Sequence, residues 1–149
     1  MRHLHWFRTD LRLNDNPALA SHAAANSLLC LFLMPKPKPW CNLTGIGAQR
    51  DRFLRESLIE LKNDLQALGQ DLLVLEGSPE LVIPHLIERY GITEVSVSDQ
   101  PGWEEKQSVA YLAGKLDIPI QIHRGNTLLS ETDLPLALED LPTVFSPFR

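Results

Sequence analysis

Two polar loops carry the residues whose types and spacing could do chemistry. The first covers residues 8–15, where arginine and aspartate alternate before two further polar side chains: Arg8, Asp10, Arg12, Asn14 and Asp15. The second covers residues 99–106 and contains the acidic pair Glu104 and Glu105. Each loop follows an apolar run typical of a strand and leads into a helix. Loops at the carboxyl ends of strands hold the ligands of open α/β sheets, so both loops are candidates for a binding site.

The sequence offers no constellation of catalytic groups. It has no glycine-rich phosphate loop ending in lysine, no nucleophilic serine elbow and no metal-ligand spacing. Gly45 and Gly47 supply only two glycines of a dinucleotide fingerprint, and they do not directly follow a strand. His3 and His5 flank the first strand, where sheet-edge or partly buried histidines are the favoured interpretation. We therefore expect no catalytic residue and no metal site in this chain.

Length and composition predict one globular domain. The chain has 149 residues, of which 44% are hydrophobic and 22% charged. Its apolar runs are too short to span a bilayer, and Arg8 and Asp10 interrupt the first of them, so a signal peptide is not expected. We read Cys30 as a core thiol and Cys41 as a loop thiol. A cytoplasmic location is the resulting expectation. The net charge of −5 argues against this chain supplying the main DNA-binding surface.

Strands and helices are predicted to alternate along the chain. Five apolar runs read as strands: the segment around Leu4–Phe7, and residues 27–34, 71–76, 92–98 and 118–123. Helices are expected over 17–25, 48–68, 79–91 and 103–116. The clearest helix has leucines on one face, at positions 54, 58, 61, 65 and 68, with Gly69 as its left-handed cap. Pro35, Pro37 and Pro39 are expected to end regular structure after the second strand. This order predicts an α/β fold, a doubly wound five-stranded parallel sheet with helices on both faces (Rossmann-like).

The opening stretch resembles the amino terminus of the photolyase/cryptochrome family. That family begins with a strand followed by Trp-Phe-Arg-x-Asp-Leu-Arg-x-x-Asp-Asn-x-Ala-Leu, and residues 6–19 match every fixed position. The last residues, 143–149, resemble the segment that leads from the family's α/β domain to its helical domain. Their Phe-Arg ending leans towards cryptochromes of the DASH type. The resemblance implies an antenna-chromophore domain over residues 1–124 and, over 125–149, an extended linker towards a helical FAD domain.

The resemblance also implies which residues bind a cofactor. Family members with a reduced-folate antenna use an acidic residue at the start of the helix after the fourth strand, which falls on Glu105, with Glu104 before it. A carboxylate accepts two hydrogen bonds from an amino-pyrimidinone edge. The alternative is that the pair only stabilises the first turn of the helix. Arg12 matches an arginine that lines the pocket in flavin-type antenna members.

Two weaker candidates lie after the second strand. Trp40 could stack on a flat ring, or it could act as a lid that covers the end of the sheet. Arg50, near the start of the long helix, could face an anionic ligand, or it could simply be solvated.

The function implied by the resemblance is that of a light-harvesting domain. The family repairs cyclobutane pyrimidine dimers with light and FAD, or senses blue light. Methenyltetrahydrofolate is the antenna expected here. FAD, the relay tryptophans and the DNA groove are expected in the helical domain, so this chain alone should not repair DNA. The alternative is a stand-alone nucleotide-binding domain of the universal-stress or electron-transfer-flavoprotein type. No membrane contact is expected.

Overall fold

The structure, a computed structural model, describes residues 1–35, 39–40, 43–127 and 133–144. Its main sheet consists of five strands: β1 (Arg2–Phe7), β2 (Ser27–Met34), β5 (Leu72–Glu76), β6 (Glu94–Ser98) and β7 (Ile120–His123). The helices are α1 (Pro17–Ala20), α2 (Ala48–Ala67), α3 (Pro79–Tyr90) and α4 (Trp103–Ala113). Residues 41 and 145–149 lie outside the described residues, so the predictions for Cys41 and for most of the exit segment are not addressed.

The five strands are all parallel and lie in the order β5-β2-β1-β6-β7. The chain builds outward from β1 through β2 to β5, then returns to place β6 on the other side of β1. The predicted doubly wound five-stranded sheet is therefore confirmed. The direction of winding reverses between β1 and β6, and a crevice opens at the carboxyl ends of the strands at such a point.

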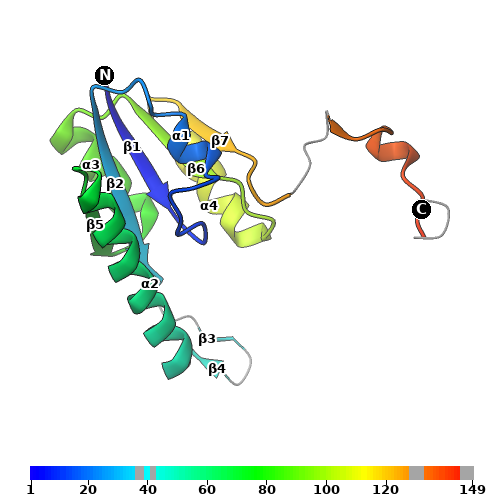
Figure 1. The fold of residues 1–149 in the computed structure, drawn as a ribbon, viewed down its shortest axis with the longest axis horizontal. Helices are drawn as coiled ribbons and strands as arrows, with labels where there is room; N and C mark the ends of the chain where they lie inside the picture. The colour runs from blue at the N-terminus through cyan, green and yellow to red at the C-terminus, as the bar shows by residue number, and fades with distance from the viewer. Residues whose placement is uncertain (36–38, 41–42, 128–132, 145–149) are drawn as a thin grey trace.

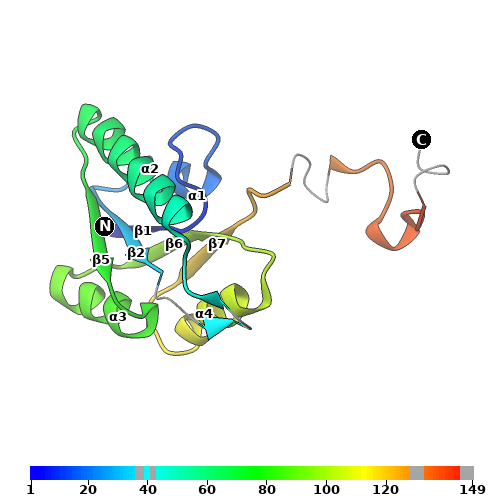
Figure 2. The ribbon, with the colours of Figure 1, turned by 90° about the horizontal axis from the view of Figure 1, so that it is seen from below.

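Helices cover both faces of the sheet. Figure 2 shows α1 and α2 on one face and α3 and α4 on the other. Two apolar clusters fill the space between these layers. Beneath α3 and α4, the buried residues are Leu4, Trp6, Leu31, Ile83, Leu86, Ile92, Val95, Val97, Val109 and Leu112. Beneath α2, they are Phe7, Cys30, Phe32, Leu58, Leu61, Leu65 and Leu72.

The layer beneath α1 is polar instead. Because side chains alternate along a strand, Leu4 and Trp6 face α3 and α4, whereas His5 points the other way. The His5 ring lies 2.7 Å from the Ser96 hydroxyl of β6, and both residues are fully buried. His22, in the turn after α1, contacts the same hydroxyl. Burial is the largest cause that lowers the pKa of both histidines to about 4, so they are neutral at physiological pH.

Local chemistry explains where the helices begin and end. Asn16 caps α1 by accepting a hydrogen bond from the Leu19 amide at 3.0 Å, and Pro17 takes the first helical position. Gly69 and Gly91 have φ of 77° and 60°, the left-handed conformation expected after α2 and α3. One position differs from the predicted apolar face of α2. Leu68 is 72% exposed, because the helix ends at Ala67 and Leu68 is its cap residue, in the turn that leads to β5.

The segment between β2 and α2 also differs from the sequence-based expectation. Regular structure was expected to end at the three prolines, but Pro39–Trp40 (β3) pairs antiparallel with Leu43–Thr44 (β4). Pro39 fits there because this strand has only one partner, which leaves one edge without ladder hydrogen bonds. Figure 1 shows this hairpin beyond the carboxyl end of β2.

The expected linker begins after β7. A 3₁₀ turn, η2 (Leu138–Asp140), lies in this segment. Both ribbon views show this orange-red segment away from the sheet. In the part of the chain that the structure describes, no helix combines the length and the apolar character needed to cross a bilayer.

Candidate functional site

The loop that leaves β1 is folded around the buried carboxylate of Asp10. Its Oδ1 accepts the Arg8 amide at 2.9 Å, and its Oδ2 accepts the Ser98 hydroxyl at 2.6 Å. The Asn16 side-chain amide also donates to Oδ2, at 3.3 Å. The same carboxylate therefore joins the end of β1, the end of β6 and the start of α1. This explains why the opening loop needs an acid and an amide six residues apart.

A pocket with a volume of about 210 Å³ lies at the carboxyl ends of β1 and β6. One part of its wall is apolar, and the other carries charged and amide groups. Its lining comprises Arg8, Ser98, Asp99, Gln100, Glu105, Lys106, Val109, Ala110 and Ile122. The pocket therefore occupies the reversal point of the sheet, where ligands of this architecture bind.

Glu105 is the predicted site residue that lines this pocket. It stands at the third position of α4, and its carboxylate lies against Gly102, which precedes the helix. A Cβ at Gly102 would overlap that carboxylate, so the glycine leaves room for it. The amino end of a helix favours an ionised acid, which suits a group that accepts hydrogen bonds from a ligand.

Arg8 forms the opposite side of the pocket. Its guanidinium lies 4.9 Å from the centre of the Trp6 ring and donates to the backbone oxygen of Glu105 at 3.4 Å. Burial lowers the pKa of Arg8, while the charges of Glu105, Asp10 and Asp99 raise it. The cation is thus partly desolvated and held among carboxylates, which keeps it fixed beside the pocket.

Gln100 supplies the clearest sign that a ligand is expected. Its side-chain oxygen accepts the Thr9 hydroxyl at 2.9 Å, while its buried Nε2 has no hydrogen-bond partner among the described residues. The residue is only 6% exposed, and an unpaired buried donor costs about 1–3 kcal/mol. An acceptor atom placed in the pocket would remove that cost. Gln100 lies in the second polar loop but was not among the predicted site residues, although its position two residues after β6 was a usable signal.

The other predicted residues of the two polar loops lie outside this lining. Glu104 is exposed on α4. Arg12 is half-exposed and turned towards the chain after β7, where it donates to the Asp15 and Gly125 oxygens at 2.9 and 3.3 Å. The structure thus brings Glu105 together with Arg8, and it gives Arg12 a tethering contact.

Of the two candidates after β2, Arg50 is not brought to the pocket lining either, and for Trp40 the structure describes the backbone only. Trp40 ends β3, where its backbone pairs with Leu43, and Arg50 is exposed in the first turn of α2. Figure 1 places this hairpin and the adjoining end of α2 apart from α4. Two neighbouring arginines fit the interpretation of solvated side chains: Arg52 pairs with Glu56 and Arg55 with Asp51, each at 2.8 Å.

The architecture and the pocket define a doubly wound α/β domain with a pocket at its reversal point. The family model described as DNA photolyase matches residues 3–149 of this chain. The chain therefore belongs to the DNA photolyase family, and it corresponds to the N-terminal domain of photolyases and cryptochromes. The predicted resemblance is confirmed.

Individual relatives agree with this assignment. A cryptochrome DASH of Gloeobacter violaceus is 35% identical over 97% of this chain, which covers 30% of that protein. The crystal structure of a Synechocystis cryptochrome superposes with a TM-score of 0.84 at 27% identity, covering 99% of this chain and 32% of that one. A class III photolyase from Agrobacterium tumefaciens shares the fold, with a TM-score of 0.78 at 22% identity over 99% and 30% of the two chains. The chain thus spans about a third of the length of these relatives.

Proposed function

We propose that this chain is a light-harvesting domain that holds a flat pterin-like chromophore, methenyltetrahydrofolate, in the pocket between β1, β6 and α4. The observation that carries the proposal is that one pocket presents both a hydrogen-bond acceptor and an unsatisfied hydrogen-bond donor. Glu105 offers a carboxylate there, and Gln100 offers a buried Nε2 that donates to no residue in the part of the chain that the structure describes.

The residues present fit such a ring chemically. The amino-pyrimidinone edge of a pterin donates in parallel to a carboxylate, the role proposed for Glu105. Its carbonyl or a ring nitrogen would accept from Gln100 Nε2. Val109 and Ile122 supply the apolar wall that one face of the ring needs. When bound, the chromophore would absorb near-ultraviolet light and pass excitation energy to a flavin.

The remaining predicted assignments stay proposals. The chain covers about a third of its relatives' length, and we assign FAD and DNA contacts to the region that it does not cover. Residues 125–149 would connect the two regions. The charge of −5 supports a DNA surface elsewhere. Photochemical repair of DNA would then require that second part, and a cytoplasmic location stays a prediction.

Chromophore binding can be tested directly. Purified chain is mixed with methenyltetrahydrofolate, passed over a desalting column and scanned for a retained near-ultraviolet band. We expect the wild type to retain one chromophore per chain. Glu105→Gln and Gln100→Leu should each reduce the retained amount by tenfold or more. The exposed acid Glu88 on α3 provides the control, because Glu88→Gln should leave binding unchanged. Glu104→Gln asks whether the neighbouring acid takes part.

Two results would refute this function. Absence of a retained band in the wild-type chain excludes an antenna held by this domain alone. Equal retention by wild type and Glu105→Gln places the chromophore elsewhere. Family membership does not favour the alternative of a stand-alone nucleotide-binding domain. Binding of ATP without binding of the pterin would restore it.

A further inference from the structure

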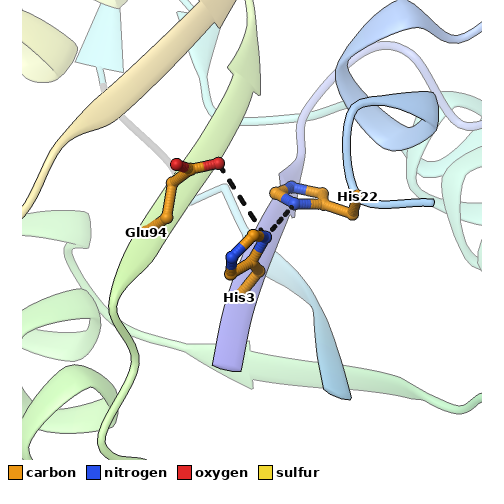
Figure 3. Close-up of side chains that lie close together, drawn as sticks. All are labelled: His3, His22 and Glu94. Carbon is orange, nitrogen blue, oxygen red and sulfur yellow. Dashed lines mark hydrogen bonds and ion pairs between the residues drawn. The ribbon is translucent and has the colours of Figure 1, made fainter. Parts of the chain in front are cut away.

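A second cluster of side chains lies at the opposite, amino-terminal edge of the same sheet. It joins His3 near the start of β1, Glu94 at the start of β6 and His22 in the turn after α1. Figure 3 shows the three side chains converging, and their nearest ligand atoms all lie within 4.8 Å of one another. His3 and Glu94 are direct partners in the register of β1 and β6, so the sheet itself sets them side by side.

The ligand atoms of the three side chains are close enough to share a proton or to bind one ion between them. The Nδ1 atoms of His3 and His22 are 2.8 Å apart, and Glu94 Oε1 lies 3.8 Å from His3 Nδ1. Nitrogen and oxygen ligands bind zinc at about 2.0–2.2 Å, so an ion requires the two nitrogens to separate by roughly 0.5 Å. The His3 and Glu94 side chains are 11% and 26% exposed, which leaves the cluster open to solvent.

The hydrogen bonds around Ser96 fix the tautomer of His22. The Ser96 hydroxyl donates its single proton to the Ala18 carbonyl at 3.0 Å. Both histidines that contact Ser96 Oγ must therefore donate to it, His5 through Nδ1 and His22 through Nε2. His22 thus carries its proton on Nε2, which leaves the Nδ1 lone pair pointing at the cluster.

This arrangement is the one that metal-binding histidines adopt. A ligating imidazole usually donates its second N–H to an oxygen, which orients the ring and raises its basicity. Ser96 and the Ala18 carbonyl provide that outer support for His22. His3 can free its own Nδ1 by holding its proton on Nε2 instead. The ion would then meet two imidazole nitrogens and one carboxylate.

We propose that His3, His22 and Glu94 form a binding site for a divalent transition-metal ion of the zinc type. Two imidazoles and one carboxylate suit zinc, cobalt or nickel and not the hard, oxygen-seeking calcium or magnesium. The ion would tie α1 to the starts of β1 and β6, at the edge of the sheet opposite the pocket of Glu105. The site does not depend on the function proposed for that pocket.

The test titrates untagged 149-residue chain with Zn²⁺ by calorimetry and with Co²⁺ by visible absorption. We expect one saturable ion per chain and a cobalt spectrum of low-coordinate type. Glu94→Gln and His22→Gln should weaken binding by more than tenfold. Ser96→Ala removes the hydroxyl that supports His22 but none of the three proposed ligands, and it should weaken binding by about 10–100-fold. Of these variants, Glu94→Gln is the least able to disturb folding, because the side chain is partly exposed and glutamine has the same shape as glutamate.

The matched control is His85→Gln, an exposed histidine on α3. It should bind the ion like the wild type, with circular dichroism confirming that every variant is folded. Lack of saturable binding overturns the proposal. It is also overturned if Glu94→Gln binds as tightly as wild type, or if His85→Gln loses the ion. Calcium binding in place of zinc would contradict the assigned class of ion.

Discussion

Removing the Asp10 carboxylate is the sharpest test of how the opening loop is built. Asp10→Ala deprives the Arg8 amide and the Ser98 hydroxyl of their acceptor. It also removes one acceptor of the Asn16 side-chain amide, which still donates to the Arg12 oxygen at 3.1 Å. Asp10, Ser98 and Asn16 are each only 4% exposed, so water replaces the lost bonds poorly. An unsatisfied buried group costs about 1–3 kcal/mol, which applies in full to the Ser98 hydroxyl and only in part to the Arg8 amide and to Asn16, so we expect a loss of ~2–4 kcal/mol.

Such a loss is large against the 5–15 kcal/mol that typically separates folded from unfolded domains. Equilibrium urea unfolding measures it, with the change read from the midpoint at constant slope. Asp10→Asn keeps one acceptor oxygen and should lose roughly half as much. A double-mutant cycle with Ser98→Ala should show that the two losses overlap, because one hydrogen bond is counted in both.

The control is Asp64→Ala, which removes an exposed carboxylate from α2 and should change stability by no more than about 0.5 kcal/mol. A destabilisation of Asp10→Ala below ~1 kcal/mol, with an unchanged urea slope, would refute the reasoning. It would mean that the loop holds its shape without this carboxylate.

Three further substitutions or treatments test the packing. Leu65→Ala should cost about 2–5 kcal/mol in urea unfolding, whereas Leu68→Ala should cost less than ~0.5, because these side chains are 2% and 72% exposed. Gly91→Ala should cost about 1–2 kcal/mol, measured by the same method, because φ is 60° there. Burial raises the pKa of the Cys30 thiol to about 11, so it should resist iodoacetamide at pH 8 until the chain unfolds, as followed by mass spectrometry. Equal reactivity in the folded chain and in urea, or equal costs for the two leucines, would contradict these assignments.

Apolar patterning was sufficient to predict the order of elements in the main sheet. Runs such as Ser27–Met34 are buried on both sides in a parallel sheet, and the leucine spacing of α2 leaves little choice of structure. The β3–β4 hairpin was missed because two-residue strands carry no period. The exposure of Leu68 was missed because the spacing of leucines does not show at which residue the helix ends.

The polar layer beneath α1 could not be predicted for a different reason. His3 and His5 looked like ordinary strand histidines, because their partners come from elsewhere in the sequence. Ser96 stands 91 residues after His5, and His22 reaches the cluster only because α1 is a single turn. Contacts of this kind depend on the register of β1 against β6, which a single sequence does not state.

The opening sequence identifies the family for structural more than for chemical reasons. Asp10 and Asn16 hold the loop to β6 and α1, and Arg12 holds it to the chain after β7. Of the fixed positions of the opening sequence, residues 6–19, Arg8 alone lines the pocket. The groups that would distinguish one ligand from another, Glu105 and Gln100, lie some ninety residues later. A chain could therefore keep the whole opening sequence and the fold while changing or losing a chromophore, so substitutions at Glu105 and Gln100 are the ones that test the proposed antenna function.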